Sequence, residues 1–495
     1  MLSSLFLLSL AAASSSGAVL PRRTNWTEQV HPHLGASIRY VTNSSVCEAS
    51  NVRQHSGYIT HGDHTGLPTE LERNLFFWFF ESRRNPSADP ITLFLNGGPG
   101  GPGSVLPTFK QFGPCIIAKS PDGFRFVTNP HSWHNYSNML YIDHPVAVGY
   151  SYGAQNYAAR SSHETVLHIW DLLQVFLETF PEFRFHRFNL YGISYGATFA
   201  PLLADHILTQ NHKIQIGLLN AYPIKLDSLV AINGWFDAPI QFKARLDFAR
   251  YNTYGPVIDD FKYTLYLDEF SESILPKLEL CPPVVGSTTT CADTLRKAEV
   301  LEHIMHREIG AWPNDAYDIR RLLARQKLGI MGQPAADPTK ARLRPFQLFN
   351  STCVRDALGA EARYQGVEHG YSRHAFHSFN MLGDGARSVL NSLSHVVDSG
   401  IKTLIWSGDA DWICNWLGTL EVARRLQHQG RQRFNSDPGQ IYKVEGHSVG
   451  QVRTGGNLTW FLQWDTCHSL GGERAEAVVR HVFEQMVDQG TLSST

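Results

Sequence analysis

The sequence predicts an α/β fold in which a mostly parallel central sheet is flanked by helices. Short apolar runs typical of buried strands alternate along the chain with stretches whose apolar residues have helical spacing. This alternation is typical of parallel sheets, because the connecting helices cover both faces. The chain has 495 residues, of which 43% are hydrophobic, so it can bury the large core that such a sheet requires.

The order of the elements follows from the apolar runs and from the residues that end them. Apolar residues at Val166, Ile169 and Leu173 indicate a helix that Pro181 ends. The next apolar run, 188–191, passes through a glycine-flanked turn directly into another helix. The expected strands are 91–95, 139–142, 188–191, 226–232, 403–406 and, as the last strand, 441–444; the expected helices include 163–179, 197–208 and 388–397.

A long segment inside the core has a different character. Residues 241–345 are rich in charged residues and helix formers and carry no parallel-strand pattern. We therefore expect a mostly helical cap inserted between two parts of the core, 46–240 and 346–488. An N-terminal extension at 19–45 and a polar tail at 489–495 complete this division of the chain.

The first 18 residues have the pattern of a secretory signal peptide. An apolar run at 5–13 precedes small residues at 14–18, although no Lys or Arg stands before it. A membrane anchor is the alternative, but the run has about half of the roughly 20 residues that a span needs. We expect a secreted protein, or one delivered to a vacuole or a lysosome-like compartment. Asn-x-Ser/Thr glycosylation sites that fit this route occur at Asn25, Asn43, Asn135, Asn350 and Asn457.

Composition and cysteine spacing limit the possible partners. The formal net charge is −2 and 18% of residues are charged, so we expect binding neither to nucleic acid nor to a membrane surface. None of the seven cysteines has zinc-ligand spacing, so disulfides are expected rather than a metal site. Cys281 and Cys291 flank a stretch rich in turn residues and are expected to pair. The odd number leaves at least one free thiol in a monomer.

Three segments match Gly-x-Ser-x-Gly, a motif of nucleophilic serines, and they present Ser151, Ser194 and Ser448. The motif works by lifting the serine above a sheet on a strained turn between a strand and a helix. Only Ser194 stands between a clear strand and a clear helix. Too little chain follows Ser448 to supply an acid and a histidine from later strands. Ser194 is therefore the predicted nucleophile of an α/β-hydrolase fold.

The catalytic partners follow the nucleophile in the order acid, then histidine, in this fold. The strand 403–406 leads to Asp409 and Asp411, and position alone allows either to be the acid. The strand 441–444 leads to His447, which is the predicted general base. The base would take the proton of Ser194, and the carboxylate would fix the imidazole tautomer.

Acyl transfer also needs backbone N–H donors for the oxyanion of the tetrahedral intermediate. One donor is predicted at Tyr195, directly after the nucleophile. The other is predicted in the run Gly97-Gly98, which ends the strand 91–95. This set of residues predicts covalent catalysis through Ser194 with neither a metal nor a cofactor.

Taken together, these motifs resemble those of the serine carboxypeptidase family. The resemblance rests on residues 95–100 (Leu-Asn-Gly-Gly-Pro-Gly), 129–133, 143–152, 192–201 and 408–418 (Gly-Asp-Ala-Asp-Trp-Ile-Cys-Asn-Trp-Leu-Gly), in order from about 47 to 482. It implies that Asp411 is the acid and that Gly98 and Tyr195 donate to the oxyanion. It also implies that Asn96, beside Gly97, binds the terminal carboxylate of the substrate, and that Cys414 is a free thiol beside the site.

The sequence departs from the family pattern in the pocket for that carboxylate. The family has an acidic residue directly before the nucleophile, where this chain has Ile193. The second acid of the family's pocket is replaced by Gln111, and after His447 the family's pattern is replaced by residues that begin with Ser448, which we also expect to contact substrate. Because the acid pair favours low pH in the family, we expect a less acidic optimum here.

Two enzymatic functions fit this combination. The first is a carboxypeptidase that releases C-terminal amino acids from peptides, with Asn96 and Gln111 donating neutral hydrogen bonds to the carboxylate. The second is an esterase or acyltransferase whose substrate has no free terminal carboxylate. A non-catalytic binding protein is disfavoured, because it would need no complete triad. The substrate is thus expected to be a peptide or a small acyl compound, and the oligomeric state stays open.

Overall fold

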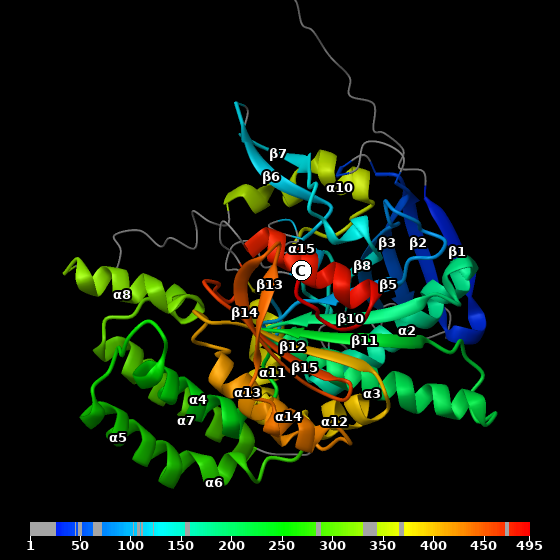
Figure 1. The fold of residues 1–495 in the computed structure, drawn as a ribbon. Coiled ribbons are helices and arrows are strands. Elements are labelled where there is room, and N and C mark those ends of the chain that lie inside the picture. Colours follow the sequence, from blue (N-terminus) through cyan, green and yellow to red (C-terminus); the bar gives the residue numbers. More distant parts are fainter. Residues whose placement is uncertain are drawn as a thin grey trace, which may run out of the picture.

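The computed structural model describes residues 26–44, 46–47, 52–62, 72–101, 103–105, 109, 112–121, 123–153, 159–283, 289–329, 344–365, 371–470 and 475–495. Within these residues a large mixed sheet forms the centre of the molecule, and helices cover it (Figure 1). Its strands are β1 (Thr27–His31), β2 (Ala36–Thr42), β3 (Gln54–His61), β4 (Arg73–Phe80), β5 (Ile91–Leu95), β8 (Asn138–Ile142), β9 (Tyr152–Gly153), β10 (Arg187–Ile193), β11 (Lys225–Ile232), β12 (Lys402–Gly408), β13 (Gln440–Val444), β14 (His447–Gly455) and β15 (Leu458–Gln463).

The middle of the sheet is parallel and both of its edges are antiparallel. The strand order is β1-β2-β3-β4-β8-β5-β10-β11-β12-β15-β14-β13, and β9 pairs with β4. The strands from β8 to β15 in this order are parallel to their neighbours. Because parallel neighbours all end at one edge, the turns after β5, β10, β11, β12 and β15 lie together, which is where ligands bind in open α/β sheets. A separate hairpin is formed by β6 (Cys115–Ser120) and β7 (Gly123–Thr128).

Helices pack on both faces of the sheet. One face is covered by α2 (Ser162–Thr179), α3 (Gly196–Gln215), α12 (Leu390–Asp398) and α13 (Trp416–Arg425), and the other by α15 (Ala475–Asp488). The strand β4 shows why both faces need cover. Its residues Phe77 and Phe79 lie in one apolar cluster, whereas Phe76, Trp78 and Phe80 lie in the other. Because side chains alternate along a strand, a strand that is apolar at every position is buried on both sides.

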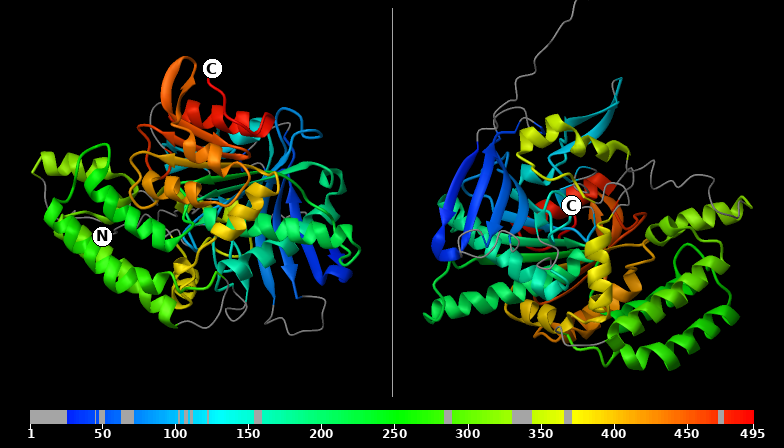
Figure 2. Two further views of the ribbon diagram at one scale, coloured as in Figure 1. Left: turned by 60° about the horizontal axis from the view of Figure 1, so that its bottom comes forward. Right: turned by 180° about the vertical axis from the view of Figure 1, so that it is seen from behind.

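A group of helices lies to one side of the sheet (Figure 1, Figure 2). It contains α4 (Ala238–Tyr251), α5 (Asp260–Glu269), the π-helical turn η6 (Phe270–Ile274), α6 (Leu275–Leu278), α7 (Thr289–Glu308), η7 (Pro313–Tyr317) and α8 (Ile319–Lys327). These helices fall in the segment that the sequence assigned to a cap. After them come η8 (Arg344–Asn350), α10 (Thr352–Leu358), α11 (Arg373–Met381) and η9 (Asp384–Ala386); α14 (Arg431–Ser436) follows α13.

The expectation that 441–444 is the last strand of the sheet is wrong. That run is β13, and it forms an antiparallel hairpin with β14, which in turn pairs antiparallel with β15. The strand that joins the parallel core is β15, because it pairs in parallel with β12 from Thr403↔Leu458 to Gly408↔Gln463. In this fold the catalytic histidine follows the last strand of the parallel core. It is therefore expected after β15 and not after β13.

Two disulfides join described cysteines. Cys281–Cys291 closes the turn between α6 and α7, as the sequence predicts. Cys47–Cys115, which the sequence did not reveal, links the segment before β3 to β6 across 68 residues. Of the remaining cysteines, Cys353 is exposed, Cys467 is half-buried and Cys414 is buried, and all three are free thiols.

Candidate active site

Ser194 lies in the turn between β10 and α3, at the edge where the parallel strands end. Its φ of 59° is in the left-handed region, a strained conformation for a residue with a side chain. Its backbone N–H donates to the carbonyl of Ile232 on β11 at 2.9 Å, and its own carbonyl accepts from Trp235 at 3.1 Å. The strand, the strained residue and the helix are the parts of a nucleophile elbow. Ser194 is partly exposed, so its hydroxyl can be reached.

The other two Gly-x-Ser-x-Gly serines have different environments. Ser151 is fully buried; its Oγ donates to the Asp143 carbonyl at 2.5 Å and accepts from the Phe76 N–H at 2.8 Å. Ser448 is exposed on β14, opposite Lys443. The first is a structural hydrogen-bonding group and the second lies on a surface hairpin, so neither occupies an elbow.

A carboxylate and an imidazole meet at the same edge of the sheet as this turn. Asp411, which is fully buried after β12, accepts a hydrogen bond at Oδ2 from His468 Nδ1 at 2.7 Å. His468 follows β15, the neighbour of β12, so the two strand ends bring these side chains together. Its backbone N–H donates to the Tyr317 carbonyl at 3.0 Å, and the two rings lie 5.1 Å apart. This pairing orients the imidazole, because a carboxylate at Nδ1 fixes the ring tautomer.

The prediction that His447 is the base of this site is therefore contradicted by the geometry. His447 is exposed at the first position of β14, where it pairs with Val444 across the hairpin turn. Its neighbour Ser448, predicted to contact substrate, is exposed on the same hairpin. The prediction takes β13 as the last strand of the parallel core. That position belongs to β15, so the residue that follows β15 is His468 and not His447.

Asp409, the other candidate acid, has a separate set of partners. Its Oδ1 accepts from the Thr466 N–H at 3.1 Å. Burial raises the pKa of Asp409 above its ordinary value. Asp409 thus holds the loop that follows β15, whereas Asp411 holds the imidazole.

Asn233 ties the strand ends together, and the sequence had not marked it as important. It follows β11 with a φ of 44°. Its Oδ1 accepts from the Gly408 N–H at 2.7 Å, and its Nδ2 donates to the carbonyl of His468 at 2.7 Å. The loop with the acid and the loop with the histidine are therefore bridged by one side chain. The Asn-Gly pair after an apolar strand is typical of a turn, but it does not indicate which distant groups Asn233 contacts.

The glycine run after β5 lies against the elbow. A Cβ atom at Gly97 would lie 2.6 Å from Ser194 Cβ and 2.6 Å from the Tyr195 backbone nitrogen, so only glycine allows this approach. Gly98 follows with a φ of 129°. Among the described residues, the N–H groups of Gly98 and Tyr195 have no hydrogen-bond acceptor. The two predicted oxyanion donors are thus on either side of the contact between this run and the elbow.

The predicted substrate-binding residues Asn96, Ile193 and Gln111 have different surroundings. Asn96 is half-buried, and its Nδ2 donates to the Gly103 carbonyl at 2.9 Å. Ile193, directly before Ser194, is 8% exposed and packs in the apolar cluster on the α15 face. Gln111 lies outside the described residues.

Among the predicted glycosylation sites, Asn43 and Asn457 are exposed, Asn135 and Asn350 are half-buried, and Asn25 lies outside the described residues, as does the predicted signal peptide.

Cys414 lies beside the acid. The donor atoms of Asp411, Cys414 and His468 lie within 4.8 Å of one another, and they are the metal-ligand set that the described residues contain. Burial raises the pKa of the Cys414 thiol well above its ordinary value, which disfavours the thiolate that a metal would need. Asp411 and His468 already bond to each other. The arrangement therefore fits acid–base chemistry better than metal binding.

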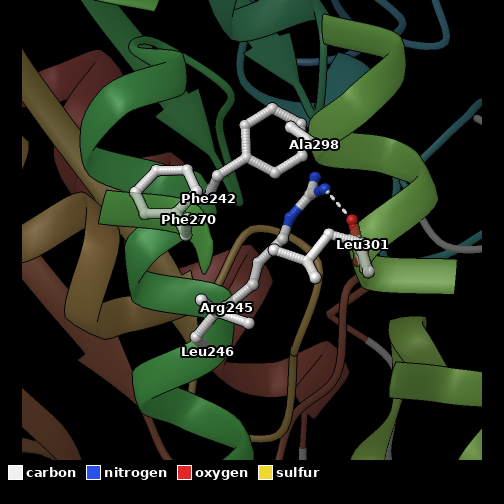
Figure 3. Close-up of a pocket in the computed structure, with 7 residues that line it drawn as sticks. Phe242, Arg245, Leu246, Phe270, Ala298 and Leu301 are labelled. Carbon is white, nitrogen blue, oxygen red and sulfur yellow. Dashed lines mark hydrogen bonds and ion pairs between the residues drawn. The ribbon is translucent and has the colours of Figure 1, made fainter. Parts of the chain in front are cut away.

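The cap supports the loop that carries the acid. The Arg245 guanidinium, 8% exposed on α4, donates from Nε to the Ile413 carbonyl at 2.7 Å and forms an ion pair with Glu302 of α7 at 2.5 Å. Figure 3 shows Arg245 reaching across a small cavity from one helix toward the other. The cavity is lined by Phe242, Arg245, Leu246, Phe270, Ala298, Leu301 and Glu302. The helices α4 and α7 thus hold the segment next to Asp411.

The family model described as serine carboxypeptidase matches residues 45–489. The chain belongs to the serine carboxypeptidase family. It is 34% identical to carboxypeptidase S1 of Penicillium janthinellum over 457 residues, which cover 92% of this chain and 100% of that one. It is 28% identical to a carboxypeptidase Y homolog of Arthroderma benhamiae, over 93% of this chain and 80% of the relative. Serine carboxypeptidases are hydrolases, so this membership places the chain among hydrolytic enzymes.

A solved structure supports the fold. The crystal structure of a prohormone-processing carboxypeptidase from Saccharomyces cerevisiae matches with a TM-score of 0.66 at 18% identity, over 89% of this chain and 91% of that one. The α/β-hydrolase fold of this serine carboxypeptidase family member, with its largely parallel sheet flanked by helices, is thereby confirmed. Among the described helices, none combines the length and the apolar character needed to cross a membrane.

Proposed function

We propose that this protein is a carboxypeptidase that releases C-terminal amino acids from peptides through an acyl-enzyme on Ser194. The observation that carries the proposal is the 2.7 Å hydrogen bond between Asp411 and His468, at the same edge of the sheet as the Ser194 elbow. The family and the names of the relatives supply the reaction class. The catalytic roles of individual residues rest on the geometry described above.

In this proposal each member of the triad has one task. His468 takes the Ser194 proton as the hydroxyl attacks the scissile carbonyl, and then gives it to the leaving amine. Asp411 accepts from Nδ1, so Nε2 is the nitrogen left to act as base. The N–H groups of Gly98 and Tyr195 stabilise the oxyanion. Water then hydrolyses the acyl-enzyme by the same proton transfers in reverse.

The terminal carboxylate would bind beside Asn96 and Gln111. An apolar residue, Ile193, occupies the position before the nucleophile, so no acid there needs to be protonated for an anionic substrate to bind. We therefore propose that activity extends to less acidic pH than a protonated acid pair would allow. The buried Ile193 is also the observation that favours a second candidate, an esterase or acyltransferase acting on substrates without a terminal carboxylate.

Blocked dipeptides distinguish these two functions. A pair of substrates with the same sequence, one with a free C-terminal carboxylate and one amidated, is compared by kcat/KM. The carboxypeptidase proposal expects at least about tenfold preference for the free acid, since a hydrogen-bonded charged group contributes about 1.5–3 kcal/mol. Equal turnover of both would reject it in favour of the second candidate.

The same proposal includes passage through the secretory pathway. Disulfides persist in oxidising compartments, and Cys47–Cys115 and Cys281–Cys291 are both formed. Expression in a eukaryotic host tests this directly: the protein should appear in the medium or a vacuolar compartment, and a glycosidase should lower its apparent mass. Retention in the cytosol without glycans would contradict it.

A further inference from the structure

A buried carboxylate lies behind the residue that follows the nucleophile. Asp384, the first residue of η9, is 3% exposed, and its Oδ2 accepts a hydrogen bond from the Tyr195 hydroxyl at 2.6 Å. Asp384 stands 190 positions downstream of Ser194 and belongs to none of the motifs recognised in the sequence. Its contact with Tyr195 therefore needs an explanation of its own.

The same carboxylate is anchored on a second element. Ser162, the first residue of α2, donates to it twice, from Oγ to Oδ2 at 2.5 Å and from its backbone N–H to Oδ1 at 3.1 Å. Burial raises the pKa of Asp384 above its ordinary value, whereas the Ser162 hydrogen bonds, at a helix start whose first N–H groups have no intrahelical acceptor, favour the anion. Arg387, 5% exposed, supplies a nearby positive charge. Asp384 is thus held in place independently of Tyr195.

Tyr195 connects this anchor to the nucleophile. Its ring makes edge contacts with Phe199 at 5.4 Å and Phe379 at 6.4 Å between centroids, and the side chain is 6% exposed. Its backbone nitrogen lies at the contact between the elbow and Gly97. One end of this residue is therefore fixed by the Asp384 carboxylate, and the other end carries the N–H assigned to the oxyanion.

We propose that Asp384 is a positioning residue that, through the Tyr195 hydroxyl, holds the Tyr195 backbone N–H in register with the oxyanion formed on Ser194. The inference rests on the proposed function and deepens it. Preorganised donors matter because a donor that must reorient during the reaction stabilises the transition state less. A purely structural role would instead hold α2 against the elbow and change stability alone.

Tyr195→Phe tests the inference, because it removes only the hydroxyl and keeps the packed ring. Loss of one oxyanion donor lowers kcat about 100-fold or more. A donor that is misplaced rather than lost should cost about tenfold in kcat, with KM within about twofold. The rate at which a fluorophosphonate labels Ser194 should fall by the same factor, because its phosphoryl oxygen occupies the same hole.

Two further variants sharpen the test. Asp384→Asn keeps a carbonyl acceptor and should lose less activity than Asp384→Ala. The double variant Tyr195→Phe with Asp384→Ala should be no slower than the slower of these two single variants, because both changes remove the same contact. Tyr442→Phe is the matched control: its buried hydroxyl donates to Gln485 Oε1 at 2.8 Å on the α15 side of the sheet, and its kinetics should be unchanged.

The proposal is overturned if Tyr195→Phe lowers the melting temperature while kcat and the labelling rate stay within twofold of wild type. Additive losses in the double variant would also overturn it. The labelling rate does not depend on which substrate the enzyme hydrolyses. If wild type is labelled but releases no amino acid from peptides, the proposed function fails, and the labelling comparison still decides this inference.

Discussion

Two short segments of the second half of the chain have the same His-Ser dipeptide and very different surroundings. His447-Ser448 begins β14 on an exposed hairpin, whereas His468-Ser469 follows β15 and faces the Asp411 carboxylate. The two dipeptides have the same side chains and differ in the strand that each one adjoins. Only the strand that joins the parallel core delivers its following residue to the edge where the other strands end. A residue's place in the sheet order thus decides whether a histidine can act as a base.

The sharpest test of this comparison is a pair of histidine variants. His468→Ala should lower kcat by about 10⁶-fold, because loss of the base alone costs about as much in kcat as loss of the whole triad. His447→Ala should leave kcat and KM within about twofold of wild type. Steady-state hydrolysis of a blocked dipeptide measures both. If the His447 variant is the inactive one, the assignment made from the structure is wrong.

The two aspartates after β12 provide the next test. Asp411→Asn should lower kcat about 10⁴-fold, as loss of the orienting carboxylate does in serine hydrolases of this type. Asp409→Ala removes the acceptor for the Thr466 N–H, so it should reduce the melting temperature more than it reduces kcat. Kinetics and thermal unfolding of both variants separate the roles. Similar kinetic losses for the two would mean that they act as a pair.

A substitution in the glycine run should lower kcat less than loss of His468 or Asp411. In Gly97→Ala the new methyl group would collide with Ser194 Cβ and with the Tyr195 nitrogen, so the elbow and the oxyanion donors must move apart. We expect kcat to fall about 100-fold, comparable to the loss of one oxyanion donor. Gly123→Ala, where an added Cβ has no atom within 4 Å but φ is 125°, is a control for backbone strain at a turn glycine without a collision. An active Gly97→Ala enzyme would place the oxyanion site elsewhere.

The smallest expected effect concerns a buried acid at the same edge that has no histidine partner. Asp143, fully buried after β8, accepts from the N–H groups of Val105 and Tyr150, and burial raises its pKa to about 7. A raised pKa means that the folded state favours the protonated form. Its contribution to stability is therefore full below about pH 4 and is lost as the pH rises through about 7.

Thermal unfolding across this range checks the Asp143 prediction. The melting temperature of wild type should include a decline between about pH 4 and 7 that is reduced in Asp143→Asn, because that side chain cannot ionise. The variant lowers stability at every pH by losing an acceptor, so the slope and not the absolute value is the readout. An unchanged slope would show that Asp143 is ionised throughout.

The sequence predicted the parallel core, the inserted helical segment, the elbow at Ser194 and the pairing of Cys281 with Cys291. These features depend on local patterns: apolar runs, a strand-to-helix turn and a short loop between cysteines. The histidine could not be predicted in the same way, because β13, β14 and β15 all have strand patterns and only pairing shows which one joins β12. Partners far apart in the chain, such as Asn233 with His468 or Asp384 with Tyr195, carry no local signal at all.

The bridge made by Asn233 has a consequence for how the enzyme comes into being. It joins segments that emerge from the ribosome at different times, since Gly408 and His468 are synthesised 175 and 235 residues after Asn233. A nascent chain that has completed the elbow still lacks its base until β15 has entered the sheet. With His468 as the proposed base, hydrolytic activity would therefore begin only when β15 has joined the sheet.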